Sequence, residues 1–254
     1  MNSFDYRSQG KIVASIEARM GSSRLPDKML LDICGKTTLE RVVERLKAVN
    51  EISEIVVATT LSDRDDSIER VARELGIACF RGSEQDVLGR VVAAHEGMGT
   101  DIIVQVCGDC PLLDPEVVAQ SIRRYLANKA DFVSNALVQT YPQGTEVSVV
   151  SMEKLKSLSL NTVDLAHREH VTLGLIELLP YDSIMSVTAE PALTAPGLRL
   201  QLDYAEDLSL IRALFSELEA SKGPLFGVKE ILNLIRLRPD IAELNSRCKE
   251  APVR

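Results

Sequence analysis

Residues 18–28 read Ala18-Arg19-Met20-Gly21-Ser22-Ser23-Arg24-Leu25-Pro26-Asp27-Lys28, a turn of small residues that carries three cations. They follow residues 11–16, whose apolar run predicts a buried strand. Gly21 permits backbone conformations closed to other residues, and the two serines add hydroxyl donors without bulk. Backbone N–H groups in such a turn can bind an anion, and cationic side chains suit phosphate oxygens. The stretch indicates a polyphosphate cradle, and the alternative is an ordinary polar loop with solvated charges.

Motif and composition narrow the class of protein. The turn matches neither G-x-x-x-x-G-K-[ST] nor G-x-G-x-x-G. The 254 residues, 45% hydrophobic and 26% charged, suit one large α/β domain with a substantial core. A net charge of −8 disfavours a broad nucleic-acid surface. No apolar run reaches the ~20 residues that span a bilayer, and the N-terminus lacks a signal-peptide core. We therefore expect a cytoplasmic protein without nucleic-acid or membrane partners.

Strands and helices alternate through the first half of the chain. The expected strands are 11–16, 55–59, 77–80 and 102–106, and the expected helices are 37–49, 68–75, 87–96 and 114–128. This alternation predicts a parallel sheet with helices on both faces, in which ligands bind at the carboxyl ends of the strands. The candidates at those ends are Arg19, Thr59, Arg81 and Asp109. Their position favours the cradle over the plain loop.

The pattern loosens over residues 134–196. In this block we expect a strand at 146–150 and a helix at 164–179, and we interpret the block as a subdomain over the site. Residues 198–202 are expected to return to the sheet. A helix that opens at Tyr204-Ala205-Glu206-Asp207, with acidic residues in its first turn, and a final helix at 228–237 follow.

Asp109 and Asp203 are the sharpest candidates for chemistry, because each follows an apolar strand and begins a loop. If those strands are neighbours, the two carboxylates can hold one hard cation such as Mg²⁺. Arg19, Arg24 and Lys28 nearby would complete a site for a metal and a triphosphate. For either aspartate alone, the alternative is a helix N-cap.

His167, Arg168 and His170 lie together near the start of the helix expected at 164–179. Histidines three apart share a helical face, so zinc is conceivable, although no third protein ligand is evident. We favour contacts of Arg168 and His170 with an acidic acceptor, and the alternative is a plain helix-surface role. Gln143 and Glu146 are further candidates for bonds to sugar hydroxyls.

Five segments occur in order between about residues 11 and 240. They are residues 18–28, Phe80-Arg81-Gly82-Ser83, Gly108-Asp109-Cys110-Pro111-Leu112, Arg168-Glu169-His170-Val171 and Leu202-Asp203-Tyr204-x-Glu206-Asp207. Together they resemble the cytidylyltransferases, in particular the spore-coat-polysaccharide type, which is related to the enzymes that make CMP-KDO and CMP-acylneuraminate. Their ordered combination is specific, although no single segment is.

The resemblance implies a three-layer, Rossmann-like nucleotide-diphospho-sugar transferase fold with a mostly parallel sheet. It implies one domain over residues 1–254, with 134–196 as an inserted acceptor-binding and dimerisation subdomain, and a homodimer. The residues expected at the CTP phosphates are Arg19, Gly21, Ser22, Arg24 and Lys28. Those expected at the base and ribose are Ala18, Thr59, Arg81, Gly82 and Ser83, with Gly108 close to the nucleotide. Asp109 and Asp203 would bind Mg²⁺.

The expected reaction is transfer of CMP from CTP to an acidic sugar of the ulosonic acid type, with release of pyrophosphate, for surface polysaccharide biosynthesis. The expected catalytic residues are Arg19, Lys28, Asp109 and Asp203. The alternatives are a nucleotidyltransferase for another base or a phosphorylated acceptor, and a non-catalytic nucleotide-binding homologue. Related sequences usually read Pro-Arg-Gly where this chain has Pro142-Gln143-Gly144, so the acceptor's identity stays open. The sequence identifies no general base.

Overall fold

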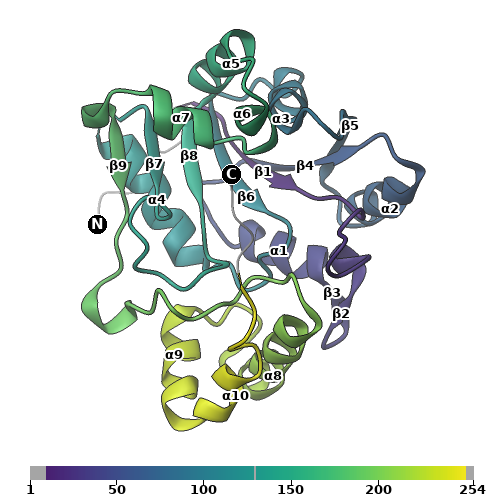
Figure 1. Cartoon of the computed structure of the whole chain (residues 1–254), viewed down its shortest axis with the longest axis vertical. Helices are drawn as coiled ribbons and strands as arrows, with labels where there is room; N and C mark the ends of the chain where they lie inside the picture. Colours follow the sequence, from purple (N-terminus) through teal and green to yellow (C-terminus); the bar gives the residue numbers. More distant parts are fainter. Residues whose placement is uncertain (1–9, 129, 250–254) are drawn as a thin grey trace.

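The computed structural model describes residues 10–128 and 130–249. Its centre is a seven-stranded sheet in the order β5-β4-β1-β6-β8-β7-β9, in which β8 alone runs against its neighbours (Figure 1). The strands are β1 Ile12–Glu17, β4 Glu54–Thr60, β5 Ala78–Gly82, β6 Ile102–Cys107, β7 Phe132–Ser134, β8 Ser148–Ser151 and β9 Ile184–Ser186. A separate ribbon pairs β2 Asp32–Ile33 with β3 Lys36–Thr37. The mostly parallel α/β sheet predicted from the sequence is confirmed.

Helices cover both faces of the sheet, because successive residues of a strand point to opposite sides. The longer helices are α1 Thr38–Lys47, α2 Asp66–Glu74, α3 Val87–Glu96, α4 Pro115–Ala127, α5 Met152–Asn161, α8 Ala205–Lys222 and α9 Val228–Leu237, and the shorter ones are α6 Leu165–Glu169, α7 Leu173–Leu178 and α10 Pro239–Glu243. Ile12 and Ala14 of β1 pack with α1, α2 and α4, whereas Val13 packs with α3, α5 and α7. A third apolar cluster joins α8, α9 and α10 below the sheet in Figure 1.

Local signals set the ends of several helices. Thr37 and Glu40 form the predicted capping box at α1, with Glu40 N donating to Thr37 Oγ1 at 3.2 Å. Gly76 follows α2 at φ +66°, a left-handed conformation that glycine adopts without strain. Asp114 caps α4, whose first residue is Pro115. The early elements therefore lie within a few residues of their expected bounds.

Two expectations for the second half are wrong. The helix expected at 164–179 is two short helices, because His170 takes an extended backbone (φ −109°) and the β-branched Val171 and Thr172 follow it. Residues 198–202 form no strand of the large sheet, since both sides of β6 are already paired with β1 and β8. Instead Arg199 makes an isolated bridge to Gln143.

The block 134–196 contributes β8 and β9 to the sheet and α5 and α7 to one of its faces, with α6 packed against α3. Its expected role in acceptor binding and dimer formation stays a prediction. In residues 10–128 and 130–249, no helix has both the length and the apolar character needed to cross a membrane.

Candidate active site

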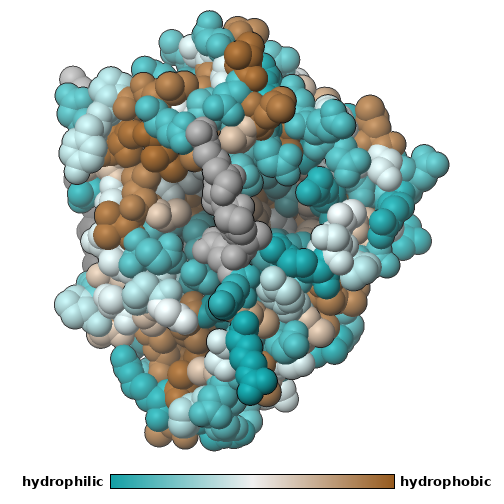
Figure 2. Space-filling model, in the orientation of Figure 1, coloured by the Kyte–Doolittle hydropathy of each residue, from teal (hydrophilic) through white to brown (hydrophobic). Residues whose placement is uncertain are grey.

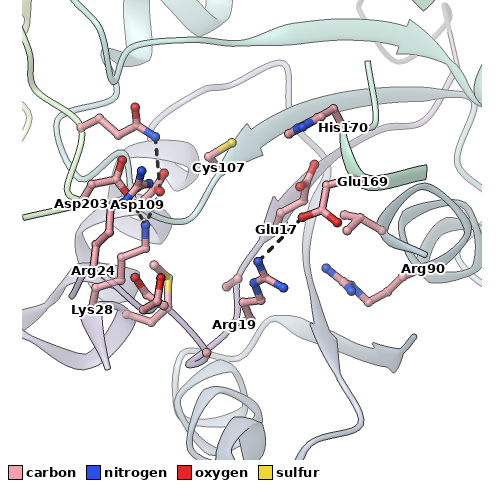
Figure 3. A pocket seen from close by; sticks show the side chains of 17 residues that line it. Glu17, Arg19, Arg24, Lys28, Arg90, Cys107, Asp109, Glu169, His170 and Asp203 are labelled. Carbon is pink, nitrogen blue, oxygen red and sulfur yellow. Dashed lines mark hydrogen bonds and ion pairs between the residues drawn. The ribbon is translucent and has the colours of Figure 1, made fainter. Parts of the chain in front are cut away.

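An open pocket of about 390 Å³ lies at the carboxyl ends of β1 and β6 (Figure 3). The predicted residues that line it are Ala18, Arg19, Gly21, Ser22, Arg24, Lys28, Asp109, His170 and Asp203. The predicted residues that do not line it are Thr59, Arg81, Gly82, Ser83, Gly108, Gln143, Glu146 and Arg168. In Figure 3, Arg24, Lys28, Asp109 and Asp203 lie at one end, and Glu17, Arg19, Arg90 and Glu169 lie at the other. We call these the lysine end and the glutamate end.

The two aspartates meet at the lysine end. Lys28 Nζ lies 2.5 Å from Asp109 Oδ2 and 2.8 Å from Asp203 Oδ1. Both carboxylates therefore face one point, although they come from segments more than ninety residues apart. Arg24 adds a second contact, 2.9 Å from Asp203 Oδ1. The convergence expected from the sequence is thus present, even though residues 198–202 are not a strand.

Opposite charges set the protonation of this end. Burial by itself would lower the pKa of Lys28, but the carboxylates of Asp109 and Asp203 outweigh it and raise that pKa above its ordinary value. Burial would likewise raise the pKa of Asp203, but Lys28, Arg24 and Arg199 outweigh it and lower that pKa. Lys28 and Asp203 are therefore both charged at neutral pH.

A buried network behind the pocket fixes Asp203. Arg199 Nη2 donates to Asp203 Oδ2 at 2.9 Å, and Arg199 Nε donates to Asp207 Oδ1 at 3.1 Å. Asp207 is fully buried and accepts the backbone N–H groups of Asp203 and Tyr204 at 2.9 and 3.0 Å. Asn245 also donates to Asp207. Asp203 is thereby held with one carboxylate oxygen directed at the pocket.

The cradle loop is anchored by Asp65, a residue that the sequence did not single out. Asp65 is buried and accepts the Met20 N–H at 2.8 Å and the Thr59 hydroxyl at 3.0 Å. The Thr59 hydroxyl is therefore engaged by the framework and does not line the pocket, and its nucleotide contact stays a prediction. Because Met20 lies between Arg19 and Gly21, this bond fixes the loop from which both cradle arginines project.

Arg81 and Gly108 also serve the framework. Arg81 Nη1 pairs with Asp66 at 2.5 Å and with Glu69 at 3.1 Å, so its guanidinium is directed to α2 and not to the pocket. At Gly108, an added Cβ would lie 2.9 Å from the carbonyl oxygen of Glu17. Glycine at this position lets the ends of β1 and β6 approach each other.

The glutamate end combines acids and cations. Glu17, the last residue of β1, accepts a short hydrogen bond from Gln105 Nε2 on the neighbouring strand. Burial raises the pKa of Glu17 to about 7. Arg90 of α3 opposes that rise, and the carboxylate of Glu169 adds to it. Arg90 is itself buried, and its Nε finds no hydrogen-bond partner among residues 10–128 and 130–249.

Only one residue of the predicted acceptor group lies in this pocket. His170 lines it, whereas Arg168 Nη1 is directed to Asp86 at 3.1 Å. His167 is buried between Thr162 Oγ1 and Glu177 Oε2, each at 2.9 Å from a ring nitrogen, so the zinc alternative has no support there. Among the described residues no group of three histidine, cysteine or acidic side chains is arranged for a metal.

The donor set at the lysine end nevertheless fits Mg²⁺. This ion binds through one or two carboxylates, waters and substrate phosphates rather than through a complete protein cage. Asp109 and Asp203 supply two oxygens that converge on one cation, at present the ammonium of Lys28. The residues present are thus of the right kind and number for a nucleotide-bound ion.

Residues 13–214 match the family model described as cytidylyltransferase. The chain belongs to the cytidylyltransferase family. It is a CTP-dependent nucleotidyltransferase. It is similar to the spore coat polysaccharide biosynthesis protein SpsF of Bacillus subtilis, with 30% identity over 91% of this chain and 96% of that protein. A 3-deoxy-manno-octulosonate cytidylyltransferase of Trichlorobacter lovleyi is 37% identical over 46% of each chain. The structure of a cytidylyltransferase from Leptospira borgpetersenii is 27% identical and superposes with a TM-score of 0.87, covering 96% of this chain and all of that one.

Several pocket residues escaped the sequence analysis, namely Glu17, Arg90, Glu169 and Gln201. A signal for Glu17 existed, because Ser15, Glu17 and Gln105 are polar residues on one face of otherwise apolar strands. Arg90 interrupts the apolar face of α3 in a similar way, three residues after Val87. Polar side chains at buried positions mark a site when they lie at the carboxyl ends of neighbouring strands.

Proposed function

We propose that this cytidylyltransferase transfers CMP from CTP to an acidic sugar of the ulosonic acid type and releases pyrophosphate, for surface polysaccharide biosynthesis. The observation that carries the proposal is the pocket with two unlike ends. At one end the cradle loop meets Lys28 and two carboxylates, and the other end of the same pocket is lined by Arg19, Arg90 and His170.

The lysine end suits the triphosphate. Arg24 and Lys28 are charged donors in the pocket wall, and both now lie on carboxylates that compete for them. Arrival of phosphate oxygens gives these cations new partners and lets them hold the leaving pyrophosphate. Mg²⁺ on Asp109 and Asp203 would neutralise charge that develops on the phosphate oxygens.

The glutamate end suits an acceptor that carries a carboxylate and several hydroxyls. Arg90 lines this end with its Nη1 donating to the carbonyl oxygen of Ser83, and within the described part of the chain Arg19 is held only by ion pairs of 3.5 Å and 3.8 Å to Glu84 and Glu169. Such cations can bind a sugar carboxylate, while Glu169 and His170 can bond to hydroxyls. The half-length similarity to a 3-deoxy-manno-octulosonate cytidylyltransferase supports the same class of acceptor.

The test is pyrophosphate release from each of CTP, UTP, GTP and ATP with Mg²⁺, in the presence of 3-deoxy-manno-octulosonate, N-acetylneuraminate or a sugar phosphate. We expect release only with CTP and a sugar acid, together with a CMP-sugar product on anion-exchange chromatography. Preference for another nucleotide or for a phosphorylated acceptor would favour the corresponding alternative. Tight CTP binding without release in any mixture would indicate a non-catalytic homologue.

We also propose a homodimer, as the family resemblance implies. Apolar side chains reach the surface near α5, α6 and α7, where Leu160, Val163 and Leu165 are 76%, 93% and 82% exposed (Figure 2). Exposed apolar groups of this kind commonly belong to an interface. Sedimentation equilibrium should give a dimer that Val163→Lys weakens, whereas Leu237→Lys at the end of α9 leaves it intact. A monomeric wild type would overturn this proposal.

A further inference from the structure

We propose that Glu17 is the general base that removes the proton from the acceptor hydroxyl during cytidylyl transfer. The inference deepens the proposed function and rests on it. It rests on the position of Glu17 in the pocket, on the residue that orients its carboxylate and on the charges around it.

Glu17 lies at the glutamate end of the pocket, at the point where β1 ends. It is the last residue of β1, opposite Cys107 in the register with β6, and the cradle loop begins at the next residue, Ala18. Figure 3 shows the carboxylate directed into the cavity on the side away from Lys28. An acceptor bound at the glutamate end would therefore lie between Glu17 and the phosphates held by the cradle.

One neighbour fixes the orientation of the carboxylate. Gln105 Nε2 donates to Glu17 Oε1, and among the described residues no other hydrogen bond reaches this carboxylate. One oxygen is thus occupied and the other is left for a substrate proton. An amide is well suited to this role, because it donates a hydrogen bond without adding a positive charge that would lower the basicity of the carboxylate.

Burial, modified by the surrounding charges, brings the pKa of Glu17 into the range useful for a base. Burial raises the pKa of Glu17 to about 7. The groups that face it are Arg90 from α3 and Arg19 from the cradle loop, which lower the pKa, and Glu169 from α6 and Asp109 after β6, which raise it. A base with a pKa near the working pH combines a useful deprotonated fraction with enough proton affinity.

The other candidates in the pocket are less suitable. Glu169 is already engaged with Arg19 at 3.8 Å. Cys107 ends β6 opposite Glu17, and the neighbouring carboxylates of Glu17 and Asp109 raise the pKa of its thiol, which therefore holds its proton. Among the described carboxylates that line the pocket, Glu17 combines an orienting amide hydrogen bond with a second oxygen that accepts none.

The step balances in atoms and electrons. The acceptor O–H gives its proton to Glu17 while the oxygen forms a bond to the α-phosphorus of CTP. The bond from that phosphorus to the bridging oxygen breaks, and pyrophosphate leaves with the electron pair. Glu17 then returns the proton to solvent. A phosphate acceptor is already ionised and needs no such base, so the assignment selects a hydroxyl as the attacking group.

The test compares wild type with Glu17→Gln and Glu17→Asp in pyrophosphate release from CTP, with 3-deoxy-manno-octulosonate as acceptor across about pH 5.5 to 9. Glutamine keeps an oxygen for the Gln105 bond and cannot take a proton. Water serves as the acceptor in a parallel slow assay, since it also attacks through an O–H bond. Glu54→Gln is the matched control, because Glu54 lies at the opposite end of the strands and pairs with Lys11 at 2.6 Å.

We expect wild-type kcat to rise with pH through about 7. Glu17→Gln should lower kcat by ~10²- to 10⁴-fold and abolish that rise, while CTP affinity measured by calorimetry stays unchanged. Glu17→Asp should keep the rise at a lower rate. A Glu17→Gln enzyme that keeps the wild-type pH profile, whatever its rate, would overturn the assignment and leave the proposed function standing. A wild type that releases no pyrophosphate with any acceptor, water included, would refute the proposed function and the base with it.

Discussion

Lys28→Met tests whether Asp109 and Asp203 form a cation site. In the free protein the ammonium of Lys28 lies at the point where the two carboxylates converge, at 2.5 and 2.8 Å. Methionine has a similar length and removes only the charge. The variant therefore leaves two partly buried carboxylates facing each other without their shared partner.

The structure gives the size of the effect. Removing one partner of a buried ion pair destabilises a protein by ~3–5 kcal/mol. Arg24 and Arg199 still partner Asp203, so we expect a loss near the lower limit, about 3 kcal/mol. For a chain of this length such a loss lowers the Tm by roughly 6–12 °C.

Magnesium should restore much of that loss in the variant. An ion present at about a hundred times its Kd stabilises the folded state by ~2.7 kcal/mol. In wild type the ion must first displace the ammonium, so the gain without nucleotide should be much smaller. The assay is thermal unfolding of both proteins with and without Mg²⁺. Lys36→Met is the control, since Lys36 makes a surface pair with Glu44 at 2.7 Å and its loss should change stability by less than ~1 kcal/mol.

Two results would refute this reasoning. Equal stability of Lys28→Met and wild type without metal would mean that the carboxylates do not depend on the ammonium. Equal stabilisation of both proteins by Mg²⁺ would mean that the ion binds elsewhere.

Three further predictions concern the same pocket. Asp109→Asn should lower pyrophosphate release at least about a hundredfold, because several kcal/mol of transition-state stabilisation is removed, and should leave circular dichroism unchanged; wild-type rates would contradict the metal assignment. Folded Glu17 holds its proton up to about pH 7 instead of 4.5, so the free energy of unfolding of wild type should fall across that interval, and urea titrations should show that Glu17→Gln abolishes the fall. Gly144→Ala should destabilise the fold by ~1–3 kcal/mol and weaken CTP binding in calorimetry, because residue 144 has φ +90° and the new Cβ would clash with the backbone nitrogen of Gln201; unchanged affinity would show that this contact does not position the neighbouring Asp203.

The sequence predicts the first half of the fold well because its signals are local. Apolar runs of five or six residues, the capping box at Thr37 and the stop at Gly76 each act within one element. The three-residue strands β7 and β9 are too short to show a period; β7 forms because β8 offers it an edge to pair with, and β9 forms because β7 does the same. Residues 198–202 are apolar enough to look like a strand. Their apolar side chains pack in the cluster with α8 instead, and the segment does not join the sheet.

In the site, too, local sequence signals are recognisable and contacts made by the fold are not. The cradle loop and the two aspartates are recognisable because charged residues follow apolar strands. The partners of Thr59, Arg81 and Arg168 are not recognisable from the sequence. In the fold these side chains contact Asp65, Asp66 and Asp86 respectively, and no local motif marks those pairs. An arginine whose carboxylate partner lies outside the pocket is directed away from a ligand there, whereas Arg24 pairs with Asp203 in the pocket wall itself.

The two aspartates have unequal supports. Asp109 continues directly from a central strand, whereas Asp203 ends a segment that is suspended from the loop between β7 and β8, through backbone bonds of Gln143 with Leu198 at 2.9 Å and with Leu200 at 2.7 Å. The segment is also tied to the frame itself, because Leu202 N donates to the carbonyl oxygen of Asp109 at 2.9 Å and Arg199 and Asp207 hold Asp203 from behind. One carboxylate thus belongs to the sheet and the other is fastened to it by hydrogen bonds, so the spacing of the pair depends on contacts between segments that are far apart in the sequence.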